Sequence, residues 1–305
     1  MDRRVIIAKR VGRLANRLVL FAHFIGAAVE HGFTVLNPAF VAQAGYFPST
    51  SKTLLCRYPP GGGVPALPGS RYFVYYAFEY YAGVLGWLQG RGHDVGLIRL
   101  RRDQHLDLNS QAFLNALEAH RVVLVQDWFF RNGLNCERHR DAICSYFTPW
   151  ETHLAAVRAV VDPVRRRDRL LVGVHVRRTD YQWFKDGRFF YSHAQYRSLM
   201  ESVQHIYPDR EVTFLVCSDE PVPQDEFAGL DVVRGPGQEL EDLYALAGCD
   251  LILGPPSTYT LWASYYGEVP RYSISDPAEP VTRDSFLVDS RLQRLGEPAA
   301  GPPRT

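Results

Sequence analysis

The second half of the chain alternates short apolar runs with longer amphipathic segments. The apolar runs are Leu170 to Val176, Val212 to Cys217 and Leu251 to Leu253. The segments that repeat apolar residues at helical spacing are 194–206, 239–247 and 257–266. Such alternation is typical of parallel strands joined by crossover helices. We therefore predict a parallel sheet flanked by helices in this half.

The first half opens with a similar unit. A strand is predicted at Arg4 to Ala8, a loop containing Gly12 follows, and apolar residues recur at helical spacing from Leu14 to His31. Strands are also predicted at Tyr72 to Phe78 and Val122 to Gln126, because both runs are rich in aromatic or β-branched residues. A strand, a glycine-containing loop and a helix indicate a Rossmann-like start.

A charged segment, Arg165 to Arg169, separates the two halves. With 305 residues, 46% of them hydrophobic and 22% charged, the chain is long and apolar enough for two globular cores. We therefore place a first domain at residues 1–165 and a second at 166–290. Residues 291–305 are rich in Pro and Gly and are expected to form a disordered tail.

Charge and cysteine content exclude several classes of protein. The net charge is +1, which gives no overall field for nucleic acid or an anionic membrane. The 5 cysteines are scattered and form no CxxC pair, so neither a zinc site nor a disulfide framework is expected. The apolar run Leu18 to Val29 is interrupted by His23 and is too short to span a bilayer. We expect a cytoplasmic, bacterial protein without a membrane span.

Polar side chains follow the ends of three predicted strands in the second half. The first strand runs into His175-Val176-Arg177-Arg178-Thr179-Asp180, the second into Ser218-Asp219-Glu220, and the third leads to Ser257-Thr258. We expect these groups to meet at one edge of the sheet, in the crevice where open α/β sheets bind their ligands. Paired arginines beside the N–H groups of a helix start favour a phosphate group.

The two arginines also have a structural interpretation. Arg177 and Arg178 are adjacent in a strand and so point to opposite faces. One is expected to face the ligand while the other braces the sheet, or both form ion pairs with Asp180 or Asp186.

The remaining groups have similar alternatives. Ser257 can be a helix N-cap and nothing more. Asp219 is either a turn residue or an acceptor for ring N–H groups of a nucleobase. His175, inside a strand, can be a hydrogen-bonded core residue.

The segment around Arg177 resembles a known motif. His-Val-Arg-Arg-Thr-Asp at 175–180 is similar to the HxRRxD motif of the fucosyltransferases that use GDP-fucose, including the α-1,2, α-1,6 and protein O-fucosyltransferase groups. Segments 217–220 and 241–263 are similar to their second and third motifs. Gly12 to Leu18 resembles the Gly-and-Asn loop of the bacterial α-1,2 members. The resemblance is poor between Pro38 and Arg169.

This resemblance implies an α/β fold of GT-B type, in which two Rossmann-like domains face a central cleft. The first domain would bind the acceptor and the second the GDP-sugar donor. The implied reaction is an inverting transfer of fucose from GDP-fucose to a hydroxyl of a glycan or other small acceptor, without a metal or other cofactor.

The resemblance also assigns roles by motif position. Arg177 is expected to hold the β-phosphate, with Ser257 and Thr258 beside it and Arg178 in support. Arg177 is also expected to be catalytic, because it stabilises the charge on departing GDP. The remaining donor-binding residues are His175 and either Asp219 or Glu220 at the guanine end, and the loop residues Gly12 and Asn16.

The base that accepts the acceptor's proton is left between Asp180, in the motif, and Asp186, on the following loop. Two other functions are weighed against fucosyl transfer. A related transferase would use another GDP-sugar, and a noncatalytic protein would bind a nucleotide or glycan on the same scaffold. An NAD-dependent enzyme is disfavoured, because no GxGxxG follows a predicted strand.

Overall fold

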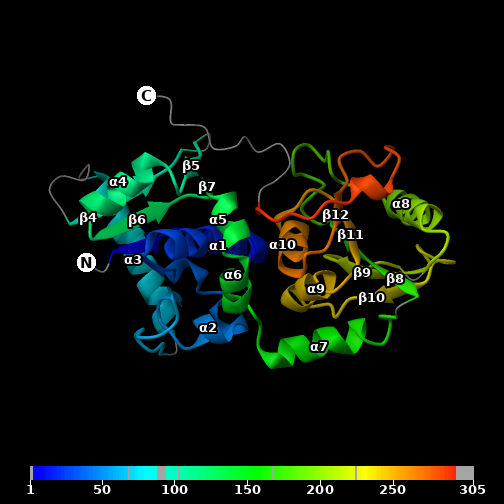
Figure 1. Cartoon of the computed structure of the whole chain (residues 1–305), viewed down its shortest axis with the longest axis horizontal. Helices are drawn as coiled ribbons and strands as arrows, with labels where there is room; N and C mark the ends of the chain where they lie inside the picture. The colour runs from blue at the N-terminus through cyan, green and yellow to red at the C-terminus, as the bar shows by residue number, and fades with distance from the viewer. Residues whose placement is uncertain are drawn as a thin grey trace. The chain divides into compact units, whose positions relative to one another are not determined.

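The computed structural model describes residues 3–67, 69–87, 94–101, 104–166, 168–223 and 225–292. All but the first two residues of the expected tail at 291–305 lie outside this described part. The chain divides into two compact units, the first ending at Trp150 and the second beginning at Glu151. Each unit contains a predominantly parallel sheet with its own helices (Figure 1).

The first unit is built on a sheet of five strands in the order β3-β2-β1-β6-β4. All neighbours are parallel except β3, which is antiparallel to β2. The strands are β1 (Arg4–Ile7), β2 (Thr34–Leu36), β3 (Arg57–Tyr58), β4 (Val95–Arg99) and β6 (Val122–Gln126). A separate parallel pair joins β5 (Leu106–Asp107) and β7 (Phe130–Arg131).

Helix α1 (Leu14–His31) is the central helix of the first unit and is buried from Leu14 to Ala28 with few interruptions. It ends at Gly32, whose φ of 69° allows its N–H to bond the carbonyl of Ala28. The other helices of the unit are α2 (Pro48–Ser51), α3 (Ser70–Trp87), α4 (Gln111–Ala119), α5 (Gly133–Arg138), α6 (Arg140–Tyr146) and the short η1 (Pro38–Phe40) and η2 (Ala44–Tyr46).

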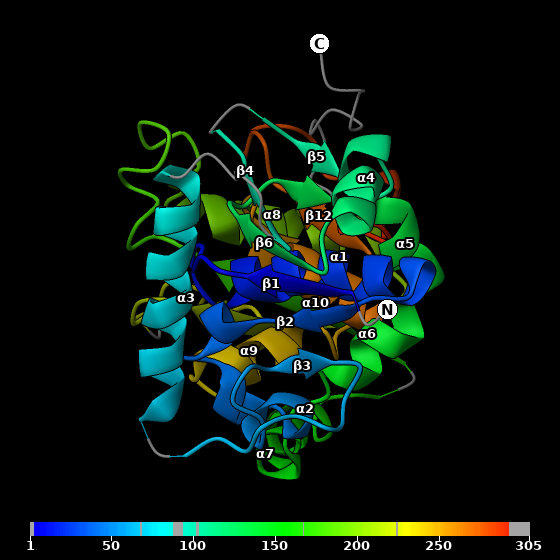
Figure 2. The same ribbon diagram turned by 90° about the vertical axis from the view of Figure 1, so that its left-hand side faces the viewer.

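The strand predicted at Tyr72 to Phe78 is wrong, because this segment lies inside α3. Its aromatic content favours a strand, but its buried residues, Tyr75, Ala82 and Leu85, follow a helical repeat. Ala82 and Leu85 pack on Leu36 and Leu124 of the sheet, so tertiary packing determines the helix. Figure 2 shows α3 along one side of the first unit's sheet.

The second unit has five parallel strands in the order β10-β9-β8-β11-β12. This confirms the predicted α/β class with parallel sheets. The strands are β8 (Arg169–Val176), β9 (Glu211–Ser218), β10 (Val232–Arg234), β11 (Leu251–Gly254) and β12 (Arg271–Ser273). The helices are α7 (Glu151–Val161), α8 (His193–Ile206), α9 (Glu239–Leu246), α10 (Thr258–Gly267) and η3 (Arg283–Ser285).

The division between the units lies earlier than the boundary expected at 165/166. Helix α7 belongs to the second unit, where it packs on α9 and His153 Nδ1 lies 3.0 Å from Glu241 Oε1. The charged segment at 165–169 is not a linker, because Arg169 starts β8. Its guanidinium bonds Glu211 at 2.7 Å and Asp231 at 2.5 Å. Arg169, one of the charges that suggested a linker, therefore fixes the start of a strand.

Candidate functional site

The ends of three neighbouring strands meet at one edge of the second sheet. The register pairs Val176 of β8 with Ser218 of β9, and Val174 of β8 with Leu253 of β11. The segments that follow these strands, 177–180, 219–220 and 255–258, therefore begin side by side. The structure thus brings together the strand-end residues that the sequence placed at one edge of the sheet.

Arg177 forms a two-point ion pair with Asp180. Its Nε and Nη2 donate to the two carboxylate oxygens at 2.9 and 2.7 Å. The guanidinium also lies over the ring of Tyr181, 4.6 Å from its centre, and the Tyr181 hydroxyl donates to the carbonyl of Pro256 at 2.7 Å. The loop after β8 is thereby joined to the loop between β11 and α10, with Arg177 held at the junction.

The Arg178 guanidinium contacts a different set of residues. Its Nε donates to Glu220 at 2.5 Å, its Nη1 donates to the carbonyl of Tyr191 at 2.7 Å, and the guanidinium lies over Phe190. These contacts tie the loop after β8 to the loop after β9. Arg178 therefore holds the strand-end loops in place.

Asp219 and Glu220, the acids expected at a nucleobase, are both engaged with the loop after β8. Asp219 accepts hydrogen bonds from the Arg178 N–H at 2.9 Å and from the Thr179 hydroxyl at 2.5 Å. Glu220 is paired with Arg178. In this geometry both carboxylates hold the loop that carries Arg177.

The third strand end leads into the start of α10. Ser257 is its N-cap, because the side-chain oxygen accepts from the Thr260 N–H at 3.2 Å. Ser257 and Thr258 are both buried. The first turn of an α-helix leaves backbone N–H groups without partners in the helix, which makes this end of α10 favourable for an anion.

His175 lies in the core beside this edge. Its ring stacks on Tyr259 with centroids 4.7 Å apart. Burial, together with the nearby charge of Arg177, lowers the pKa of His175 to about 3, and its buried Nδ1 has no hydrogen-bond partner among the described residues. His175 is therefore a neutral imidazole with one ring nitrogen still to be satisfied.

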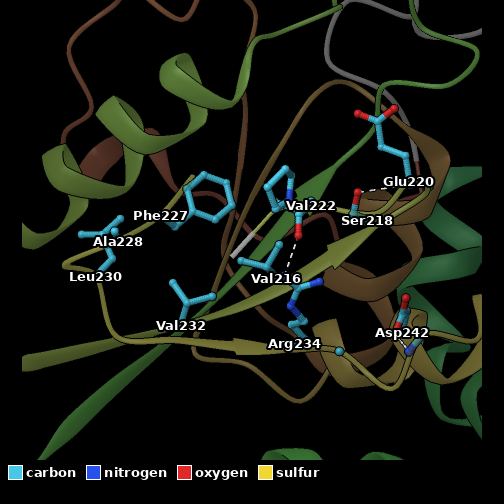
Figure 3. A pocket seen from close by; sticks show the side chains of 13 residues that line it. Val216, Ser218, Glu220, Val222, Phe227, Ala228, Leu230, Val232, Arg234 and Asp242 are labelled. Atoms are coloured by element: carbon cyan, nitrogen blue, oxygen red, sulfur yellow. Dashed lines mark hydrogen bonds between the residues drawn. The ribbon is translucent and has the colours of Figure 1, made fainter. Parts of the chain in front are cut away.

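A pocket of about 430 Å³ opens beside the ends of β9 and β10 (Figure 3). One wall is apolar, and the other carries Asp242 from the first turn of α9. The Glu220 carboxylate also borders the pocket but is directed away from Asp242 (Figure 3). The apolar wall is formed by Val216, Val222, Phe227, Ala228, Leu230 and Val232.

Asp242 is the acid of this pocket, and the sequence interpretation gave it no role. It is only 7% exposed, and its Oδ1 accepts from the Gly237 N–H at 2.8 Å. Burial raises the pKa of Asp242. Its other oxygen, Oδ2, has no hydrogen-bond partner among the described residues, so the pocket contains a carboxylate oxygen that can accept from a ligand.

Gly235, before α9, leaves the space that the Asp242 carboxylate occupies. A Cβ at Gly235 would lie 2.6 Å from Asp242 Oδ1 and 2.6 Å from the sulfur of Cys217. Glycine is therefore required for Asp242 to reach this position. The motif resemblance includes Glu241 and Asp242, but nothing in a single sequence tells which of the two acids turns inward.

Gly12 and Asn16 belong to the first unit, on the loop between β1 and α1. Gly12 has a φ of 52°, and a Cβ there would lie 1.9 Å from the Asn16 side chain. Arg17 donates to the carbonyl of Gly12 at 2.9 Å, so the loop is held by its own residues. Within the described chain, these groups form a local turn whose compactness requires glycine.

Asp186 lies on an exposed turn after β8, with a φ of 57°. Among the described residues it has no hydrogen bond or ion pair with Arg177, Asp180 or Ser257. Metal-ligating side chains, His, Cys, Asp and Glu, form no group of three or more in the described chain that could hold an ion. None of the described helices is both long and apolar enough to cross a bilayer.

Comparison with known proteins gives matches among solved structures. No family model matches the sequence, and no curated protein matches it. A mutant of FUT1 from Arabidopsis thaliana in complex with GDP is 13% identical with a TM-score of 0.59, over 94% of this chain and 74% of that one. The fucosyltransferase NodZ from Bradyrhizobium is 17% identical with a TM-score of 0.51, over 90% and 96%.

POFUT1 in complex with GDP-fucose is 10% identical with a TM-score of 0.53, over 88% of this chain and 94% of that one. NodZ, described as an α-1,6-fucosyltransferase, also matches in a crystal soaked with GDP-fucose. At these identities the likeness concerns the fold. The chain therefore has the fold of a group of structures that includes fucosyltransferases bound to GDP and GDP-fucose.

Proposed function

We propose that this protein is an inverting, metal-independent glycosyltransferase that moves fucose from GDP-fucose to a hydroxyl of a glycan or other small acceptor. The observation that carries the proposal is the pocket of the second unit. It combines a buried acid and an apolar wall, and it opens beside the strand end that leads to Arg177, in a fold shared with GDP-bound fucosyltransferases.

The buried Asp242 carboxylate would favour guanine over adenine as the nucleobase. Guanine presents two adjacent N–H donors, N1–H and the 2-amino group, and a carboxylate accepts both. Adenine offers no such pair, because its N1 is an acceptor. Oδ2 of Asp242 is available for this contact while Oδ1 stays with Gly237. Phe227 and Val222 provide apolar surface for the faces of the ring.

The diphosphate is assigned to Arg177 and the start of α10. Nε and Nη2 of Arg177 are used by Asp180, and Nη1 makes no hydrogen bond to the described residues. Asp180 therefore acts as a positioning residue that fixes the plane of the guanidinium while Nη1 contacts phosphate. Backbone N–H groups at the start of α10, near Ser257 and Thr258, supply further donors.

In the reaction, the acceptor oxygen attacks the anomeric carbon as the bond to the β-phosphate oxygen breaks. The electron pair of that bond leaves with GDP, so negative charge grows on the diphosphate. Each well-placed donor toward that charge contributes roughly 2.7–4 kcal/mol to catalysis. Asp186 is the base we propose for the acceptor's proton, since both oxygens of Asp180 are already engaged by Arg177.

Calorimetry without added metal tests the donor. Native protein is expected to bind GDP and GDP-fucose, to bind GDP-mannose more weakly, and not to bind UDP. The Arg177→Ala variant is expected to lose most of the affinity for GDP and GDP-fucose, because it lacks the contact with the diphosphate. Chelation with EDTA is expected to leave binding unchanged. No binding of GDP by native protein would refute the proposal. Equal binding of GDP-mannose and GDP-fucose would instead support the alternative function, a transferase that uses another GDP-sugar as its donor.

A further inference from the structure

The outer face of α3 carries an exposed row of aromatic side chains. Their exposed fractions range from 46% for Tyr72 to 82% for Trp87. Soluble monomers seldom leave so many large aromatic groups together in water. The members of this row, called here the α3 aromatic face, are Tyr72, Phe73, Tyr76, Tyr80 and Trp87.

The two charged side chains of α3 do not reach this face. Arg71 donates to the backbone carbonyls of Thr50 and Thr53 at 3.2 and 3.3 Å. Glu79 is hydrogen-bonded to the buried Tyr75. The charge beside the α3 aromatic face comes from outside the helix: the Arg10 guanidinium lies over the ring of Tyr76, 5.7 Å from its centre, and donates to the Tyr76 hydroxyl at 3.4 Å.

The spacing of the face follows a heptad. Phe73, Tyr76, Tyr80, Gly83 and Trp87 are separated by three, four, three and four residues, the pattern by which two helices pack knobs into holes. Gly83 is exposed, and a Cβ built there meets nothing within 4 Å. The seam thus has large knobs at most positions and one open hole.

We propose that a second copy of this chain covers the α3 aromatic face, with the two α3 helices packed antiparallel about a two-fold axis. In such an interface, residues equally distant from the axis meet each other. An axis between Tyr76 and Tyr80 places Phe73 of one copy on Gly83 of the other. The same axis places Trp87 on Gly69, where again a Cβ would meet nothing within 4 Å.

The area of the face matches what a stable dimer needs. At roughly 150–250 Å² per aromatic side chain, the exposed fractions leave about 500–850 Å² on each copy. A standard interface buries about 800 Å² per partner. Val64 and Leu67, both exposed just before α3, extend the apolar surface. A lipid surface is disfavoured, because α3 presents no cluster of Lys and Arg residues to anionic headgroups: its own Arg71 donates to backbone carbonyls instead.

The test is the mass of the full chain by analytical ultracentrifugation at micromolar concentrations. Native protein is expected to have twice the mass of one chain. Phe73→Glu and Gly83→Leu are each expected to give the mass of a single chain, the first by burying a charge and the second by filling the hole. Gly83→Leu also favours the helix itself, so its thermal midpoint should not fall.

Ala112→Glu on α4 is the matched control, since it adds a charge to an exposed helix of the same unit and should leave the dimer intact. A native protein that remains a single chain would overturn the proposal. So would a dimer that survives both α3 variants. Binding to uncharged phosphatidylcholine vesicles that Phe73→Glu abolishes, with native protein as a single chain, would assign the face to lipid instead.

Discussion

Replacing Asp242 with Asn is expected to weaken GDP binding without unfolding the second unit. Oδ1 of Asn can still accept from the Gly237 N–H, which lies 2.8 Å from this oxygen in the native protein. The atom that changes is the one facing the pocket, where an amide donor replaces the carboxylate oxygen. Two guanine N–H groups then face a donor instead of an acceptor.

The magnitude follows from the burial of the group. Asp242 is only 7% exposed, so water cannot replace the lost acceptor. A hydrogen bond to a charged group contributes about 1.5–3 kcal/mol, which corresponds to a loss of roughly 10- to 160-fold in affinity. The matching change Glu239→Gln, at an exposed position on the same turn of α9, should change the affinity for GDP by less than about twofold.

Inosine diphosphate provides the sharpest assay, because it lacks the 2-amino group of GDP. Native protein should prefer GDP to inosine diphosphate by calorimetry, and Asp242→Asn should lose most of that preference. If Asp242→Asn binds both ligands as native protein does, the base does not lie on Asp242. Burial raises the pKa of Asp242, so acidification should weaken native GDP binding at a pH where an exposed Asp would still be charged, and Asp242→Asn should lack this effect.

Three further changes test other parts of the site. Arg177→Ala should slow hydrolysis of GDP-fucose by at least 100-fold, measured by release of GDP, whereas an unchanged rate would exclude Arg177 from leaving-group stabilisation. Gly235→Ala places a methyl group 2.6 Å from Asp242 Oδ1 and should cost about 1–3 kcal/mol of GDP binding in calorimetry; undiminished binding would mean that Asp242 can move. The pKa of His175 is lowered by burial to about 3 from an ordinary value of 6.5, so acidification protonates the unfolded chain first. Below pH 6.5, the free energy of unfolding by urea should therefore decrease as the pH is lowered, and this slope should be steeper by about 1.4 kcal/mol per pH unit in native protein than in His175→Phe. Equal slopes would mean that His175 is protonated in the folded protein.

The helices that the sequence predicted well are those whose burial follows a clear repeat. The bounds predicted for α1 agree with the structure, those of α9 differ by one residue at its end, and α10 is shifted by one residue at both ends. Strands of three residues, such as β10 and β12, are too short to show a repeat. Helix α3 was missed because its aromatic residues favour a strand by composition, whereas only its contacts with the sheet show which face is buried.

At the site, the order of strand ends could be predicted because parallel strands all finish at one edge. The hydrogen-bonding or ion-pair partner of each side chain could not be predicted. Whether Arg177 pairs with Asp180 or Asp186 depends on the turn after β8, and only the folded loop shows the two-point pair with Asp180. Asp242 was missed because its burial depends on how α9 is rotated against β8 and β9.

The hydrogen bond from Tyr181 to the carbonyl of Pro256 has a practical consequence. It joins two loops, so a ligand that shifts the start of α10 also pulls on the turn after β8. Trp183 lies on that turn, 79% exposed, with its backbone N–H 3.3 Å from the carbonyl of Asp180. The indole of Trp183 is therefore an intrinsic fluorescence probe of this turn. Its emission should report nucleotide occupancy in real time, and Trp183→Phe identifies its share of the signal.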